Sequence, residues 1–128
     1  MTREQISALQ LERLQATVRH CMNSPFYKQR FEEIGLKPED IKSLDDIRKI
    51  PFTTKADLRD TYPFGMASVP LRECTRLHSS SGTTGTPTVI LHTKKDLEEW
   101  ANQVARNLWM VGLSPDDVFQ NSSGYDMF

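Results

Sequence analysis

The sequence SSSGTTGTPT at residues 79–88 decides how this chain is interpreted. It consists of hydroxyl side chains, two glycines and a proline, with no charge and no bulky apolar group. Gly82 and Gly85 allow positive φ and a close approach of the backbone to a ligand. Hydroxyls and successive backbone N–H groups in such a turn can form an anion site, which suggests a phosphate loop. The same composition also fits a flexible hairpin loop or linker.

The segments around this loop predict an α/β arrangement. Short apolar stretches at 75–78 and 89–92 predict a strand on each side of the loop. Thr93, with Asp96 three residues later, predicts the start of a helix that ends near Gly112. A further strand is expected at 118–120. This strand-loop-strand-helix-strand unit is typical of part of a parallel or mixed sheet with a crossover helix.

The residues before this unit predict a helical N-terminal segment. Apolar residues at helical spacing and a Thr2–Gln5 capping box predict an amphipathic helix over 3–22. Ser24 and Pro25 predict a second helix that Gly35 ends. Shorter helices are expected after Ser43 and after Thr53 or Thr54, followed by a linking loop at 64–70. We therefore expect one incomplete domain, with a helical segment at 1–70 and the start of an α/β subdomain at 71–128.

Composition excludes several classes of function. A net charge of −1 without a basic run argues against nucleic-acid binding. No apolar run approaches the roughly 18 residues of a membrane span. Cys21 and Cys74 are far apart and predict reduced thiols in a cytoplasmic protein. The three histidines lack helical metal-ligand spacing and an acidic cluster, so no metal site is expected.

The loop resembles the phosphate-loop signature of the adenylate-forming enzymes, the superfamily of acyl- and aryl-coenzyme A ligases. Their pattern, Ser-Ser/Thr-Gly-Thr-Thr-Gly-Lys-Pro, is met at every position but one by Ser80, Ser81, Gly82, Thr83, Thr84, Gly85 and Pro87. Thr86 stands where the superfamily usually has lysine.

The segments 53–59, 62–65 and 76–78 are similar to the phenylacetate–coenzyme A ligase family. The resemblance extends from about Ser24 to the last residue and covers only the N-terminal part of such a ligase. A second departure is Asp126, where the family more often has glycine.

The resemblance implies ATP-dependent ligation of phenylacetate, or a related aryl acid, to coenzyme A through an acyl-adenylate. It implies ATP, Mg²⁺ and coenzyme A as substrates and cofactor, with small molecules as the partners. The implied phosphate-binding residues are Ser80, Ser81, Gly82, Thr83, Thr84, Gly85 and Thr86. Tyr125 and Phe128 are implied to border the acid pocket, although ordinary aromatic packing explains them equally well.

The family's catalytic lysine and its ribose- and adenine-binding segments have no counterpart in this sequence. We therefore expect no catalytic residue here and no thioester formation by this chain alone. We also expect self-association through unpaired sheet edges. Three alternatives remain open: a stand-alone phosphate- or nucleotide-binding module, an interaction module that uses the N-terminal helices, and a ligase for another aryl or acyl acid.

Overall fold

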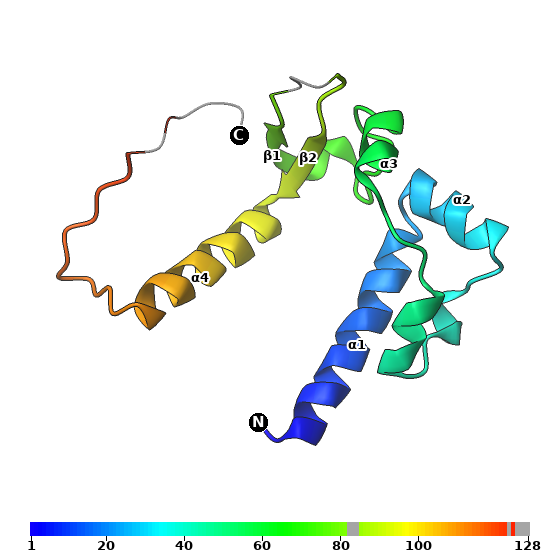
Figure 1. Cartoon of the computed structure of the whole chain (residues 1–128), viewed down its shortest axis with the longest axis horizontal. Coiled ribbons are helices and arrows are strands. Elements are labelled where there is room, and N and C mark those ends of the chain that lie inside the picture. Colours follow the sequence, from blue (N-terminus) through cyan, green and yellow to red (C-terminus); the bar gives the residue numbers. More distant parts are fainter. Residues whose placement is uncertain (82–84, 123, 125–128) are drawn as a thin grey trace. The chain divides into compact units, whose positions relative to one another are not determined.

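The fold is described from a computed structural model, which covers residues 1–81, 85–122 and 124. The chain forms two compact units, Met1–Pro70 and Leu71–Phe128. Figure 1 shows the first as a set of helices and the second as a hairpin followed by a long helix. Each unit is described by itself.

The first unit begins with helix α1, Arg3–Cys21, which confirms the amphipathic helix predicted near these bounds. The Gln5 backbone N–H donates to Thr2 Oγ1 at 3.3 Å, and the Thr2 N–H donates to Gln5 Oε1 at 2.9 Å. This reciprocal cap satisfies two donors that the first helical turn would otherwise leave unpaired. Val18, which is 2% exposed, is the buried residue of the helix.

Helix α2, Pro25–Glu33, follows after a short turn and ends as predicted at Gly35. Gly35 has φ +67°, in the left-handed region that favours glycine. The Leu36 N–H donates to Phe31 O at 2.9 Å and the Gly35 N–H donates to Glu32 O at 3.1 Å. These two bonds form a Schellman cap, which satisfies carbonyls at the end of the helix.

The core of the first unit lies between α1, α2 and the segment that follows them. Its buried members are Val18, Phe31, Leu36 and Ile41. Partly buried side chains pack around them, among them Leu14, Met22 and Tyr27. Phe31 is only 1% exposed, so this aromatic residue belongs to the core.

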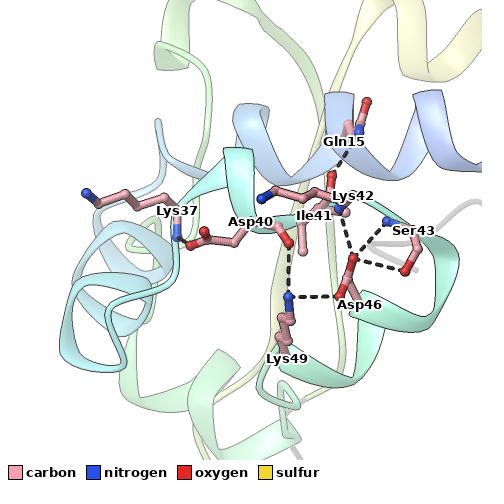
Figure 2. A network of polar contacts seen from close by, with 8 residues as sticks. All are labelled: Gln15, Lys37, Asp40, Ile41, Lys42, Ser43, Asp46 and Lys49. Atoms are coloured by element: carbon pink, nitrogen blue, oxygen red, sulfur yellow. Dashed lines mark hydrogen bonds and ion pairs between the residues drawn. The ribbon is translucent and has the colours of Figure 1, made fainter.

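A polar network fixes the segment between α2 and the linking loop (Figure 2). This segment contains two 3₁₀-helices, η1 at Pro38–Asp40 and η2 at Leu44–Lys49. Asp46 Oδ2 accepts hydrogen bonds from the N–H groups of Lys42 and Ser43, at 2.9 and 2.7 Å, and from Ser43 Oγ at 3.0 Å. Lys49 Nζ lies 2.8 Å from Asp46 Oδ1. The Lys49 hydrogen bond and the two backbone donors hold the pKa of Asp46 below its usual range.

The network also connects this segment to α1. The Gln15 side chain donates to Ile41 O at 2.8 Å (Figure 2).

Beyond η2, helix α3 at Lys55–Asp60 is capped by Thr54, whose N–H donates to Asp57 Oδ2 at 2.6 Å. Asp57 Oδ1 also forms an ion pair with Arg30 Nη1 of α2, at 3.1 Å. This ion pair connects α3 to α2.

The second unit contains an antiparallel hairpin followed by helix α4. After the 3₁₀-helix η3 at Leu71–Glu73, strand β1, Cys74–Ser79, pairs with strand β2, Val89–Thr93. Helix α4, Lys94–Met110, starts at once, with Thr93 as its cap. The Thr93 N–H donates to Asp96 Oδ2 at 2.8 Å. The predicted strand-loop-strand unit, the following helix and the α/β class are therefore confirmed.

The strand predicted at 118–120 is wrong: within 85–122 the structure has no strand after α4. Val118 is 98% exposed and Phe119 is 62% exposed, so this segment lies against no sheet. A strand forms by pairing, and the described sheet contains only β1 and β2. The pairing described is also purely antiparallel, so no parallel neighbour contributes to it.

Candidate functional site

The hairpin brings the two ends of the segment 79–88 together. Ser79, the last residue of β1, pairs with Val89, the first of β2, and is 7% exposed. The sheet therefore holds the two ends of the segment 80–88 beside each other. Gly82, Thr83 and Thr84 lie outside the described residues.

Ser80 and Thr88 continue the pairing by one step into the loop. The Ser80 backbone N–H donates to Thr88 O at 3.0 Å. The Thr88 N–H donates back to the Ser80 side-chain Oγ, also at 3.0 Å. Because Oγ acts here as an acceptor, the hydroxyl proton of Ser80 remains available to a further acceptor, such as a phosphate oxygen. Ser80 can thus close the loop and bind an anion at the same time.

Two other predicted site residues lie on the return side of the loop. Gly85 has φ +122°, a conformation that side chains other than that of glycine rarely adopt. A Cβ at this position would meet nothing within 4 Å, so the constraint is on the backbone and not on space. Thr86 is exposed, as is Ser81 on the outgoing side. Their hydroxyls are therefore accessible to a ligand.

Tyr125 and Phe128, the predicted residues of the acid pocket, lie outside the described residues. Gly124 is described and is exposed. The residues implied in phosphate binding are contiguous in the sequence, from Ser80 to Thr86.

A ring cluster lies on the hairpin close to the loop. His78 on β1, His92 on β2 and Trp100 on α4 form it; we call it the His–Trp cluster. The His78 and His92 ring centroids are 5.1 Å apart, and the Trp100 centroid is 5.4 Å from each. His78 Nε2 is buried and has no hydrogen-bond partner. The cluster connects the start of α4 to both strands that carry the loop.

Sequence reasoning missed the pairing of His78 and His92 because it tested only helical spacing. The hairpin register supplies the signal: His78 pairs with Ile90, and His92 pairs with Arg76. Alternate residues of paired strands share a face, so the two histidines are diagonal neighbours. The Trp100 ring packs against both histidine rings.

Within residues 1–81, 85–122 and 124, two other kinds of site are absent. No group of three or more His, Cys, Asp or Glu side chains is arranged to hold a metal ion. No helix in this part of the chain combines the length and apolar character of a membrane span.

Comparison with known proteins identifies the class. No family model matches the chain. It is 46% identical over 126 residues to the phenylacetate-coenzyme A ligase of Escherichia coli (strain K12), covering 98% of this chain and 29% of the relative. The ligase of the same name from Pseudomonas putida is 50% identical over 120 residues, covering 93% and 27%. That of Thermus thermophilus is 46% identical over 129 residues, covering 100% and 29%.

These identities, over nearly the whole chain, place it among the coenzyme A ligases. Within that class, the chain belongs to the phenylacetate–coenzyme A ligase family. It spans less than a third of the length of the curated relatives that it matches.

Proposed function

We propose that this chain supplies the N-terminal part of a ligase that joins phenylacetate, or a related aryl acid, to coenzyme A at the expense of ATP. The observation that carries the proposal is the identity of 46–50% to phenylacetate-coenzyme A ligases over 93–100% of the chain. In this proposal residues 71–128 begin the nucleotide-binding subdomain, and residues 1–70 form the helical segment that precedes it.

The reaction has two steps. A carboxylate oxygen of the acid attacks the α-phosphorus of ATP, the bond to the β-phosphate oxygen breaks, and pyrophosphate leaves. The thiol of coenzyme A then attacks the acyl carbon and displaces AMP, which gives the thioester. Negative charge grows on the departing β- and γ-phosphates in the first step. Donors fixed in advance at that place stabilise the charge without having to reorganise.

The loop at 79–88 offers such donors. We assign phosphate binding to the residues that match the superfamily pattern and its one departure: Ser80, Ser81, Gly82, Thr83, Thr84, Gly85 and Thr86. The closure between Ser80 and Thr88 supports this assignment, because it fixes the first hydroxyl while leaving its proton available. The positive φ of Gly85 supports it too, since the backbone there can approach a ligand without a Cβ.

The loop is less suited to hold Mg²⁺ directly. Residues 79–88 contain no carboxylate, and Mg²⁺ is usually bound through carboxylates and substrate phosphates. Thr86 is neutral at the position where lysine is usual, so the loop also lacks a cation. Mg²⁺ bound to the phosphates would supply counter-charge, while the hydroxyls and N–H groups of the loop bind and orient them.

Further parts of the proposal concern substrate, assembly and location. Tyr125 and Phe128 are assigned to the border of the acid pocket. Isolated from the rest of the ligase, the chain is proposed to self-associate, since β1 and β2 each have one neighbour in the described sheet. A cytoplasmic location is supported by the two free cysteines, Cys21 and Cys74.

The test uses this chain joined, in one polypeptide, to the part of the E. coli relative that follows the matched region; we call this protein the joined ligase. We expect ATP–pyrophosphate exchange that depends on phenylacetate and is weaker with benzoate, acetate or hexanoate. The 128-residue chain alone is expected to show no exchange. Exchange driven equally by unrelated acids, or none with any acid, would overturn the proposal. Exchange by the chain alone would show that the complete ligase is not needed.

A further inference from the structure

Helix α4 has a continuous apolar face, which we call the α4 stripe. Its residues recur three or four positions apart, and such positions lie on one side of an α-helix. The opposite side carries polar and charged residues, among them Lys95, Asn102 and Arg106. The stripe consists of Leu97, Trp100, Ala101, Val104 and Leu108 of α4 and of Val111, which caps its C-terminus.

The stripe is largely uncovered in the described structure. No residue of α4 is buried. Trp100 is 45% exposed although it contacts both histidines, and Val104 and Val111 are 44% and 81% exposed. The stripe therefore has the apolar composition of a buried helix face, although it is exposed here. A contiguous exposed apolar surface of this kind marks an interaction site.

The hairpin is too small to be that cover. Helix α4 has 17 residues and is about 25 Å long at 1.5 Å per residue. Its first turns lie beside β1 and β2, and the helix then continues away from them (Figure 1). None of the described hydrophobic residues after Pro70 is buried, so the second unit has no core of its own. A lone two-stranded hairpin is at best marginally stable in water.

The length of the relatives indicates what covers the stripe. The chain accounts for 27–29% of each matched ligase, so most of such a protein is polypeptide absent from this structure. In α/β proteins an amphipathic helix next to a small sheet buries its apolar face against more strands and helices of that domain. The His–Trp cluster already starts this layer at one end of the stripe.

We propose that the α4 stripe is the docking face for the remaining part of the ligase, and that this contact supplies the core that the second unit lacks. The inference rests on the proposed function in that it takes the chain to be part of a ligase. It goes further by naming the surface through which the phosphate-loop hairpin is joined to the rest of the enzyme.

The test measures thiol labelling at single positions of α4. Val104→Cys places a thiol in the stripe, and Asn102→Cys places one on the opposite, polar side as a matched control. Ala101→Cys is a second stripe probe that changes side-chain volume little. Labelling by a water-soluble maleimide is measured by mass spectrometry of the peptide that contains the probe, so other cysteines do not interfere.

In the isolated 128-residue chain, at low concentration, all three thiols should react at similar rates. In the joined ligase the two stripe probes should react at least ~20-fold more slowly, while Asn102→Cys keeps its rate. Equal rates at all three positions of the joined ligase would overturn the inference. Slow labelling of the stripe in the isolated chain would also overturn it. In that case protection that grows with concentration indicates a second copy as the cover, and protection at every concentration indicates cover within the chain.

Pyrophosphate exchange is measured on the same joined ligase without probes, so that the two proposals can fail separately. Protection of the stripe without phenylacetate-dependent exchange supports the docking face and contradicts the proposed substrate. Phenylacetate-dependent pyrophosphate exchange without protection of the stripe thiols from labelling contradicts the docking face and leaves the proposed substrate standing.

Discussion

Two hydrogen bonds join Ser80 and Thr88, one between backbone groups and one from the Thr88 backbone to the Ser80 side chain. The Ser80 N–H donates to Thr88 O, and the Thr88 N–H donates to Ser80 Oγ, each at 3.0 Å. Both residues are partly buried, so a lost partner is not fully replaced by water. This relationship makes the shape of the loop depend on one hydroxyl that we also assign to phosphate binding.

Ser80→Ala should therefore weaken the closure of the loop. The substitution removes the acceptor of the Thr88 N–H, and loss of such a bond typically costs about 1 kcal/mol. We expect faster amide hydrogen exchange at Thr88 and a lower midpoint of thermal unfolding. The matched control is Ser81→Ala at the exposed neighbouring position, which should stay within about 0.5 kcal/mol of the parent. Unchanged exchange at Thr88 in Ser80→Ala would contradict the role given to the hydroxyl.

Gly35→Ala should destabilise the first unit by about 1 kcal/mol, because alanine disfavours the left-handed conformation seen at φ +67°. No atom lies within 4 Å of the added Cβ, so the cost is conformational and not steric. Gly35→Asn should recover part of the loss, since asparagine tolerates this region better. Urea unfolding followed by circular dichroism measures the difference. Equal midpoints for the parent and Gly35→Ala would show that the Schellman cap does not determine stability.

Acidification should weaken the segment around η2 through Asp46. Its pKa is held below the usual value by Lys49 and by backbone donors, so its folded-state pKa lies below its unfolded one. The stabilisation is present above the unfolded pKa, about 3.9, and is lost as the pH falls through the lower folded-state pKa.

Urea midpoints between pH 2 and 7 test this account. Asp46→Asn should be less stable than the parent at pH 7 and should lose less stability on acidification. Asp45→Asn, an exposed neighbour, is the control and should follow the pH profile of the parent. A pH profile in Asp46→Asn as steep as that of the parent would assign the acid sensitivity to other carboxylates, of which Asp57 is the first candidate.

Trp100→Ala should loosen α4 from the hairpin, because it removes the ring that contacts both His78 and His92. We expect faster hydrogen exchange in the first turns of α4 and in β2. Trp109→Ala is the matched control: Trp109 is 71% exposed on the same helix, and its loss should leave these exchange rates unchanged in the isolated chain. The His–Trp cluster would have no connecting role if the two variants behaved alike.

Much of the fold could be predicted because local signals agree with it. The caps at Thr2 and Thr93 and the end of α2 at Gly35 are set by residues within five positions along the chain, and the structure has all three. The strand predicted at 118–120 failed because its apolar residues need a neighbouring strand that the described sheet does not contain. Apolar sequence indicates the tendency to pair, but not whether a partner is present.

The candidate site could be predicted in part. The loop could be recognised because its residues are contiguous. The positive φ of Gly85 and the strands on both sides of the loop follow from residue type. The bond from Thr88 to Ser80 Oγ, by contrast, depends on which serine the hairpin register places opposite Thr88. The meeting of His78 and His92 depends on the same register, so neither could be derived before the strands were aligned.

The central claim is that the loop at 79–88 holds the outer phosphates of ATP, and Gly85→Val in the joined ligase tests it most directly. Gly112→Val is the matched control, since Gly112 also has a positive φ, +92°, but ends α4 instead of lying in the loop. Phenylacetate-dependent ATP–pyrophosphate exchange should fall at least ~100-fold in Gly85→Val, a loss of about 2.7 kcal/mol of transition-state stabilisation, and less than ~3-fold in Gly112→Val. Equal exchange in Gly85→Val and the parent would contradict the claim.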